Sequence, residues 1–429
     1  MRCAKYATMN SSKQEESNMG STSFWQRDAR EAIEAPPLSG TQETDVTIIG
    51  GGITGISAAL WLVRAGVRVS VLEARRIAVA ASGRNGGFLA DGTTALYADA
   101  IEQHGRERAR RMWAFSVANH AYAEQFIQEL EEQNWRCDYR RAGSLKLAAS
   151  EDELATIHKS VTLMQEDGWQ ASMLKREELP GRLRQAYYGG AFFPANGALH
   201  PVRFVTGLAH LAQQAGATIY EASPVTAIEQ RAGHIELATT NGKVHAQRVI
   251  LATNAWIPEV GRLIGPDSQA DWLSNCITPT RGQIIATQPL SERILPCPCS
   301  ANEGYQYWRQ LEDGRLIVGG WRNHSFESEA RTYDESPYDG IQQHLDAFVH
   351  TTLDLPNTRI VSRWAGIMAF TPDSLPLAGR LPGLPRLYIC GGYTGHGNAF
   401  AIHAARLVAD LVQGRPNADA ELFDPGRFK

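Results

Sequence analysis

Three glycines and one carboxylate within residues 45–73 have the residue types and the spacing of a site for nucleotide phosphates. Gly50, Gly52 and Gly55 form the pattern GxGxxG, and Glu73 closes the apolar run that follows. In such a site the first glycine permits a tight turn, the second lets the backbone approach a pyrophosphate, and the third lets a helix pack closely on a strand. A carboxylate at Glu73 can accept hydrogen bonds from the two hydroxyls of an adenosine ribose. The chemistry indicated is therefore the binding of a dinucleotide.

The elements that must position these residues lie in the same stretch. Residues 45–49 form a short apolar run typical of a buried strand, residues 53–65 carry apolar side chains at helical spacing, and a second strand ends at Glu73. GxGxxG alone also occurs in ordinary strand-to-helix turns, but strand, turn, helix, strand and acid in register favour a binding site with its phosphates at the helix N-terminus. Arg75 and Arg76 follow the carboxylate and are also compatible with a ligand that carries a 2′-phosphate, such as NADP. Because Glu73 takes the ribose position, we interpret both arginines as solvated charges or as neighbours of the adenine.

A second informative stretch, residues 77–92, follows the carboxylate and has the sequence IAVAASGRNGGFLADG. Its small residues and glycines are expected where a backbone runs past a large flat ligand, although a surface loop is the ordinary alternative. GGGITG, LEA and ASGRNGG together resemble the D-amino-acid-oxidase-type family of FAD-dependent oxidoreductases, and most closely its gamma-glutamylputrescine oxidoreductase branch. The resemblance implies FAD as the cofactor, with contacts from Gly50, Gly52, Ile53, Thr54, Gly55, Glu73, Ala74, Arg75, Ala81, Ser82, Gly83, Arg84, Asn85, Gly86 and Gly87.

A third glycine stretch, residues 387–413, predicts a strand, a loop and a long amphipathic helix that begins near Gly397 or Asn398. The positive end of that helix would face the flavin edge that becomes anionic on reduction. The resemblance implies flavin contacts from Gly392, Tyr393, Thr394, Gly395, His396, Gly397 and Asn398, and a backbone contact to adenine from Val225. His396 is the best titratable candidate for catalysis, although a role in orienting the flavin fits it equally well.

The substrate side of the site is less defined by the sequence. Tyr305 and Tyr307 lie two apart in a predicted strand, so both would lie on one face, either as an aromatic wall over the flavin or as packed sheet residues. In the resembling family, amino-acid-oxidising members often carry an arginine shortly after the tryptophan-glycine element to bind the substrate carboxylate. The matching residue here is Met368. Residues 360–380 also contain no cysteine that would link a flavin, so non-covalent FAD is expected.

The resemblance, together with the missing arginine, implies an FAD-dependent oxidoreductase that removes hydride from the carbon next to an amine and gives an imine that hydrolyses. The expected substrate is a small-molecule amine, such as a gamma-glutamylated polyamine or an N-alkyl amino compound, and the electron acceptor is oxygen, a quinone or a protein. One alternative is the oxidation of glycine, sarcosine, proline or a D-amino acid, with Arg281, Arg309 or Arg322 binding the carboxylate. Another is a catalytically silent flavoprotein scaffold.

Composition sets the remaining expectations. The formal charge of −4 is dispersed, so no nucleic-acid partner is expected, and apolar runs are too short to span a membrane. The six cysteines show neither zinc spacing nor a disulfide framework, which predicts no metal site and a cytoplasmic protein.

The chain of 429 residues predicts two domains with interleaved segments. The resemblance implies an α/β fold, in which a Rossmann-like FAD-binding domain of the glutathione-reductase type alternates with an α+β substrate domain on a mixed or antiparallel sheet. Residues 1–44 are polar and are expected to form a flexible leader, in which Phe24, Trp25 and the segment to Pro37 pack across the protein. The FAD-binding domain is expected over 45–98, 195–260 and 361–429, and the substrate domain over 99–194 and 261–360.

Overall fold

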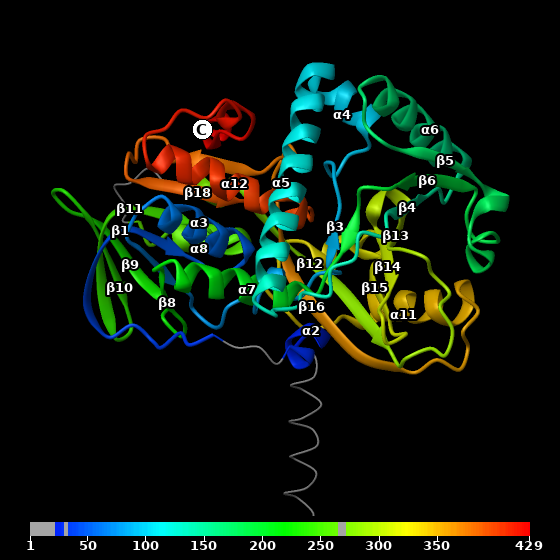
Figure 1. Cartoon of the computed structure of the whole chain (residues 1–429), viewed down its shortest axis with the longest axis horizontal. Helices are drawn as coiled ribbons and strands as arrows, with labels where there is room; N and C mark the ends of the chain where they lie inside the picture. Colours follow the sequence, from blue (N-terminus) through cyan, green and yellow to red (C-terminus); the bar gives the residue numbers. More distant parts are fainter. Residues whose placement is uncertain (1–21, 30–32, 265–271) are drawn as a thin grey trace, which may run out of the picture.

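The chain folds around two large sheets that lie side by side in the computed structural model, which describes residues 22–29, 33–264 and 272–429 (Figure 1). The first sheet has the strand order β17-β18-β11-β1-β2-β8, and the hairpin of β9 and β10 extends from β11. The pairs formed among β8, β2, β1, β11 and β18 are parallel, as in a doubly wound nucleotide-binding sheet. The strands are β1 (Gly40–Ile49), β2 (Val69–Leu72), β8 (Thr218–Tyr220), β9 (Val225–Gln230), β10 (Ile235–Thr239), β11 (Gly242–Leu251), β17 (Leu377–Arg380) and β18 (Leu387–Gly391).

The second sheet has the order β16-β12-β15-β14-β13-β4-β6-β5. Its pairs are antiparallel except for β13 with β4, which makes the sheet mixed. The expected α/β architecture with a second mixed sheet is thereby confirmed. The strands are β4 (Ser144–Leu147), β5 (Ser172–Lys175), β6 (Gly189–Phe193), β12 (Thr278–Thr287), β13 (Cys299–Ala301), β14 (Gln306–Gln310), β15 (Leu316–Gly320) and β16 (Ile360–Phe370). A small separate sheet pairs β3 (Phe88–Leu89) with β7 (Gly197–Ala198).

Helices cover both sheets, and α5 stands between the two halves of the molecule (Figure 1). α3 packs against α12 and α7 beside the nucleotide-binding sheet, and α5 packs on α12. α3 and α12 are among the most hydrophobic helices of the described chain. Their apolar residues are therefore almost wholly buried. The helices are α2 (Phe24–Asp28), α3 (Ile53–Arg64), α4 (Tyr97–His104), α5 (Arg106–Glu132), α6 (Glu151–Glu166), α7 (Pro201–Gln214), α8 (Ile257–Gly261), α9 (Leu273–Cys276), α10 (Phe326–Glu329), α11 (Asp339–Ala347) and α12 (Gly397–Val412).

Two expectations about chain organisation differ from the structure. β16 pairs along its length with β12, so it belongs to the second sheet, whereas the sequence boundary at residue 361 assigned it to the FAD-binding domain. Its near-continuous apolar run gave no sign of which sheet it joins. The leader is ordered over 22–29 and 33–44, because Trp25 and Leu38 are each only 1% exposed and β1 begins at Gly40. Trp25 thus packs on the body of the protein, as expected, while the flexibility predicted for residues 1–21 lies outside the described residues.

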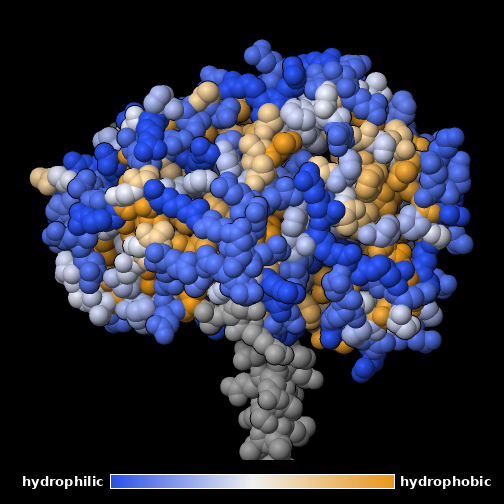
Figure 2. All heavy atoms as spheres, in the orientation of Figure 1, coloured by the Kyte–Doolittle hydropathy of each residue, from blue (hydrophilic) through white to orange (hydrophobic). Residues whose placement is uncertain are grey.

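The face of the molecule drawn in Figure 2 carries mainly polar side chains. Figure 2 shows one face covered largely by hydrophilic residues, with apolar residues in patches between them. In the described part of the chain, no helix combines the length and the apolar character that crossing a membrane requires.

Candidate functional site

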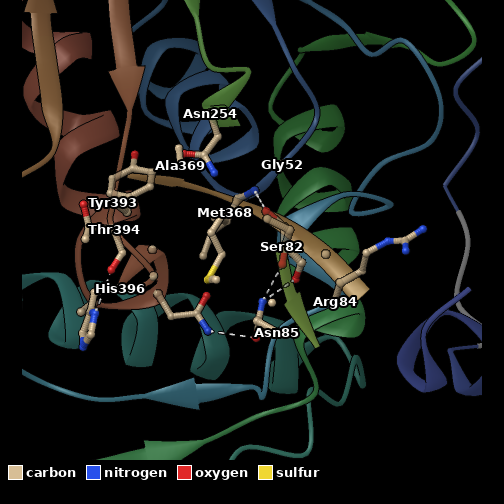
Figure 3. A pocket seen from close by; sticks show the side chains of 18 of the residues that line it. Gly52, Ser82, Arg84, Asn85, Asn254, Met368, Ala369, Tyr393, Thr394 and His396 are labelled. Carbon is tan, nitrogen blue, oxygen red and sulfur yellow. Dashed lines mark hydrogen bonds between the residues drawn. The ribbon is translucent and has the colours of Figure 1, made fainter. Parts of the chain in front are cut away.

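A cavity of about 950 Å³ brings the three glycine stretches together. Its wall combines the turn before α3, the loop after β2, the loop before α12 and parts of the second sheet (Figure 3). Most of the predicted site residues line it: Gly50, Gly52, Ile53, Thr54, Glu73, Ala74, Arg75, Ala81, Ser82, Arg84, Asn85, Gly86, Val225, Tyr307, Tyr393, Thr394, Gly395, His396, Gly397 and Asn398. Gly55, Gly83, Gly87, Gly392 and Tyr305 are not among its lining residues.

The glycine turn between β1 and α3 has no room for a side chain at Gly50 or Gly55. Gly50 has a φ of +112°, and a Cβ there would lie 2.7 Å from the Ala252 carbonyl oxygen. A Cβ on Gly55 would lie only 1.9 Å from the Gly50 carbonyl oxygen, so this glycine sets how closely the helix approaches the turn. Gly52 is the N-cap of α3 and supplies no side-chain hydrogen bond there. The N-terminus of α3 therefore faces the cavity with its backbone, as an anion site requires.

Glu73 holds this turn through backbone hydrogen bonds. Its Oε2 accepts from the Gly51 N–H at 2.7 Å, and its Oε1 accepts from the Arg75 N–H at 2.8 Å. Burial raises the pKa of Glu73, and these two hydrogen bonds act against that shift. Each carboxylate oxygen keeps a second lone pair for a ligand. The Arg75 guanidinium is bound to Glu335 at 2.7 Å, so it is neutralised within the protein.

The loop after β2 joins the turn to the rest of the wall. Ser82 Oγ accepts from the Ile53 N–H at 3.0 Å, and the Asn85 amide donates to the Ser82 carbonyl at 3.0 Å. Arg84 is buried, with its guanidinium donating to the Ala365 carbonyl at 2.7 Å and pointing away from the cavity in Figure 3. The Arg84 guanidinium therefore fixes the loop on β16, while Arg84 also lines the cavity, where the resemblance predicts a cofactor contact. Gly87 likewise binds within the protein, because its carbonyl accepts from Arg309.

The loop before α12 forms the opposite wall. Thr394 has a φ of +48° and is held by its N–H, which donates to the Ala369 carbonyl at 2.8 Å. The Tyr393 hydroxyl lies 2.9 Å from Thr54 Oγ1, which ties this loop to α3. The Asn398 amide donates to the Phe88 carbonyl at 2.9 Å. Gly392, with a φ of +76°, supports the loop from outside the cavity through a hydrogen bond from its N–H to Asn254 Oδ1.

His396 lies in this wall immediately before the first turn of α12, confirming where the helix begins. Its Nδ1 lies 3.1 Å from Thr94 Oγ1. Burial lowers the pKa of His396 to about 4, and the positive charges of Lys146 and Arg322 act in the same direction. The imidazole is therefore neutral at pH 7, and it can donate or accept a hydrogen bond without carrying charge.

The two tyrosines predicted to share a strand face are separated by the structure. Tyr307 lies in β14 and lines the cavity, but Tyr305 precedes the strand with helical backbone angles. The short helical turn before β14 removes Tyr305 from the alternation on which the prediction relied. Tyr305 instead packs edge-on against Phe326 and under the Arg322 guanidinium.

Met368 projects from β16 into the middle of the cavity, between Tyr393 and His396 on one side and Ser82 and Asn85 on the other (Figure 3). The sequence offers Arg281, Arg309 and Arg322 as alternative binding groups for a substrate carboxylate. The guanidinium groups of two of them already bind other groups of the protein. Arg281 binds Glu329 at 2.9 Å, and Arg309 donates to the Gly87 and Leu199 carbonyls.

Arg322 is the arginine that remains. It lines the cavity, and its guanidinium carbon lies 4.4 Å from the Tyr305 ring centre and 5.0 Å from that of Phe370. Burial lowers its pKa. Lys146 lines the same cavity, and burial lowers its pKa too. Among the described residues, neither cation forms an ion pair within 4.0 Å.

Lys146 was missed in the sequence. Residues 144–147 alternate between partly buried and buried positions, with Leu145 and Leu147 on the buried face. The period of two therefore places Lys146 on the opposite face, which is the signal that identifies it. The described residues contain no group of three or more His, Cys, Asp or Glu side chains that could hold a metal ion.

Comparison with known proteins decides the class of this site. The family model described as FAD dependent oxidoreductase (DAO) matches residues 45–411. The chain belongs to this family. It is 31% identical to a probable oxidoreductase OrdL of Haemophilus influenzae over 89% of this chain and 86% of that protein. It is also 30% identical to the gamma-glutamylputrescine oxidoreductase of Escherichia coli over 94% of this chain and 90% of that protein.

Solved structures of two oxidoreductases share the fold. Glycine oxidase from Geobacillus kaustophilus matches with a TM-score of 0.75 at 23% identity, covering 90% of this chain and 98% of that one. L-Proline dehydrogenase from P. horikoshii matches with a TM-score of 0.74 at 25% identity over the same shares. The chain is thus an FAD-dependent oxidoreductase of the amine and amino-acid oxidase type, and its glycine turn without side chains fits the FAD pyrophosphate.

Proposed function

We propose that the protein oxidises a C–N bond of an amine that also carries a carboxylate, with a gamma-glutamylputrescine-like compound as the leading candidate. The observation that carries this proposal is the position of Met368, whose uncharged side chain projects into the cavity where an arginine would bind the carboxylate of an α-amino acid. An apolar side chain there favours a substrate whose oxidised carbon bears no carboxylate. The similarity to gamma-glutamylputrescine oxidoreductase supports the same class.

The walls of the cavity support the proposed cofactor-binding roles. In this proposal Glu73 binds the adenosine ribose, the backbone at Gly52, Ile53 and Ser82 faces the pyrophosphate, and Val225 lies at the adenine. The loop from Tyr393 to Asn398 and the N-terminus of α12 face the flavin ring. Bound FAD would accept the hydride from the carbon next to the substrate nitrogen. The protein would hold the neutral amine in place and exclude water.

Arg322 and Lys146 supply an anion-binding end to the cavity. A guanidinium between two aromatic rings keeps its fork of donors for a planar carboxylate, and a lysine nearby adds a second positive charge. Both side chains lie in a cavity and lack ion pairs in the described structure, so an anionic ligand would relieve their cost of burial. Gamma-glutamylputrescine meets this requirement, because an alkyl chain and an amide join its primary amine to a glutamyl group with a free carboxylate.

The same two cations favour a second candidate, the oxidation of a small amino acid such as glycine, sarcosine, proline or a D-amino acid. In that case Arg322 would bind the carboxylate next to the oxidised carbon, in place of an arginine at position 368. The two candidates differ in how far the carboxylate lies from the carbon that loses hydride.

The proposal also covers the cellular compartment and the electron acceptor. The described cysteines are free thiols, which supports a reducing compartment such as the cytoplasm. Reoxidation by oxygen would give hydrogen peroxide in proportion to the amine consumed, whereas a quinone or protein acceptor would give none.

The experiment is an anaerobic titration of the FAD-loaded protein with matched compounds, followed through the flavin absorbance near ~450 nm. We expect bleaching by gamma-glutamylputrescine, little by putrescine, which lacks the carboxylate, and little by glycine, sarcosine, proline or D-alanine. Strong bleaching by a small amino acid alone would select the second candidate. A flavin band that none of these compounds bleaches would contradict both and favour a silent scaffold.

A further inference from the structure

A continuous chain of acid and base groups crosses the protein beside the cavity. Oδ1 of Asp91 lies 2.8 Å from Nδ1 of His120. Nε2 of His120 lies 3.0 Å from the Tyr139 hydroxyl. That hydroxyl donates a 2.7 Å hydrogen bond to Oε1 of Glu124. Four ionisable groups are thus linked by three contacts, all of hydrogen-bond length.

The two ends of this chain meet different surroundings. Asp91 lines the cavity, and 10% of its side chain is exposed. The His120 side chain in the middle is 5% exposed. Glu124 at the far end is 30% exposed and pairs with Arg141, which is 53% exposed. The groups therefore connect the cavity wall to the outer solvent through a buried histidine.

The inner end is held in a fixed position. The Asp91 N–H donates to Asn196 Oδ1 at 2.9 Å, and the Asn196 amide donates to Ser144 Oγ at 2.8 Å. The Tyr139 ring packs against Gly197, where an added Cβ would lie 2.8 Å from a ring carbon. Fixed groups of this kind exchange protons without searching for a partner.

We propose that Asp91, His120, Tyr139 and Glu124 form a proton relay between the cofactor cavity and solvent. A proton that reaches Asp91 from the cavity passes to Nδ1 of His120. His120 releases the proton on Nε2 to the Tyr139 oxygen, and Tyr139 releases its own hydroxyl proton to Glu124. Each inner group gains one proton on its cavity side and loses one on its outer side, so one proton enters at Asp91 and one leaves from Glu124.

The reaction class supplies this proton. An alkylammonium substrate, oxidised FAD and water give a carbonyl compound, ammonium, the reduced anionic cofactor and one proton. That proton leaves the substrate nitrogen before the neighbouring C–H bond breaks. When cofactor and substrate fill the cavity, bulk water is excluded and a path through the protein is needed. Burial and the hydrogen bond to Glu124 raise the pKa of Tyr139, so the phenol exchanges protons while remaining neutral.

The relay requires a flavin in the cavity but no particular amine, so it is tested without a substrate. The FAD-loaded protein is reduced by light with EDTA under anaerobic conditions and then mixed in a stopped-flow instrument with ferricyanide in weak buffer. Two ferricyanide ions take two electrons and no proton, so the proton on N5 of the reduced flavin is left in the cavity and passes to solvent through the relay if Asp91 is its acceptor. Flavin absorbance near ~450 nm reports the electrons, and phenol red reports the proton.

In the unaltered protein we expect the two signals to coincide. In Tyr139→Phe and in Glu124→Gln, proton release should lag flavin oxidation by about a hundredfold, the lower range for one positioned proton-transfer group. Glu124→Gln can still accept the tyrosine hydrogen bond but takes no proton, so it tests the relay even if Tyr139→Phe does not fold. Tyr122→Phe, which removes a phenol from α5, the helix that carries His120 and Glu124, should behave as the unaltered protein. Coincident signals in both relay variants would overturn the proposal.

Discussion

Oε2 of Glu73 accepts a 2.7 Å hydrogen bond from the Gly51 N–H, so the carboxylate that follows β2 is joined directly to the glycine turn that follows β1. The sequence-based interpretation gave Glu73 a single task, the binding of a ribose. The structure adds a second one, because both oxygens also fix backbone amides of the protein. Loss of the charge should therefore weaken the site in two ways.

Glu73→Gln should raise the Kd for FAD by about tenfold to a hundredfold, since hydrogen bonds to charged groups contribute about 1.5–3 kcal/mol. Titration of the apoprotein with FAD, followed by flavin fluorescence, measures the change. Glu236→Gln, which removes the same charge on β10 outside the cavity lining, serves as the control. An unchanged Kd in Glu73→Gln would contradict the ribose assignment.

Two glycines of one motif should respond differently to substitution. A Cβ at Gly52 would meet the movable Ser82 Oγ at 2.9 Å, whereas a Cβ at Gly55 would meet the Gly50 carbonyl oxygen at 1.9 Å. Gly52→Val should therefore fold but lose bound FAD, and Gly55→Ala should fail to give soluble folded protein. Gly181→Ala, which has open space around it, should match the unaltered protein in circular dichroism and flavin content. A folded Gly52→Val with full flavin would contradict the placement of the pyrophosphate.

The glycine turns could be predicted because their function depends on local backbone geometry, which leaves a mark within a few neighbouring residues. Gly50, Gly52 and the helix start at Gly397 all lie where the sequence places them. Tyr305 could not be placed, because a short helical turn before β14 shifts it off the strand. Such a turn depends on packing that adjacent residues do not encode.

Contacts between segments that lie far apart in the chain could not be predicted from the sequence either. Nothing near Arg84 in the sequence indicates that its guanidinium binds Ala365, which lies far along the chain on β16. Asp91 and His120 carry no distinctive motif in the sequence. Only the fold brings Oδ1 of Asp91 to within 2.8 Å of Nδ1 of His120. Lys146 and Arg322 likewise share one cavity only after the second sheet has formed.

The N-terminal helix should stabilise the cofactor loop. Trp25 is 1% exposed, and its indole N–H donates to the Asn85 carbonyl at 2.8 Å. Trp25→Ala should cost about 3–5 kcal/mol through loss of a buried aromatic side chain, and Trp25→Phe about 1 kcal/mol through loss of one hydrogen bond. Thermal unfolding measures the order of the variants. Phe326→Ala, at a side chain that is 51% exposed, should leave the Tm almost unchanged. A Tm of Trp25→Ala equal to that of the unaltered protein would contradict the packing of α2 against the cofactor loop.

His396 should make the protein less stable in acid. Its folded pKa, lowered by burial to about 4, lies below the value of about 6.5 for free histidine, so the unfolded chain binds more protons between these pH values. The contribution to stability is complete above pH ~6.5 and falls as the pH approaches ~4. His396→Gln should show a shallower loss of Tm over this range. An identical slope in both proteins would show that the histidine is not buried in its neutral form.

Arg322 should determine the preference for substrates with a carboxylate. Arg322→Met removes the guanidinium but keeps a long side chain between Tyr305 and Phe370. It should lower kcat/KM for gamma-glutamylputrescine by about tenfold to a hundredfold, the loss expected for hydrogen bonds to one charged group. It should leave the weak reaction of putrescine unchanged, because that compound has no carboxylate to lose. Arg322→Lys should recover part of the effect, since the charge remains but the planar fork does not. An equal loss for both compounds would show that Arg322 supports the fold of the cavity and does not bind the substrate.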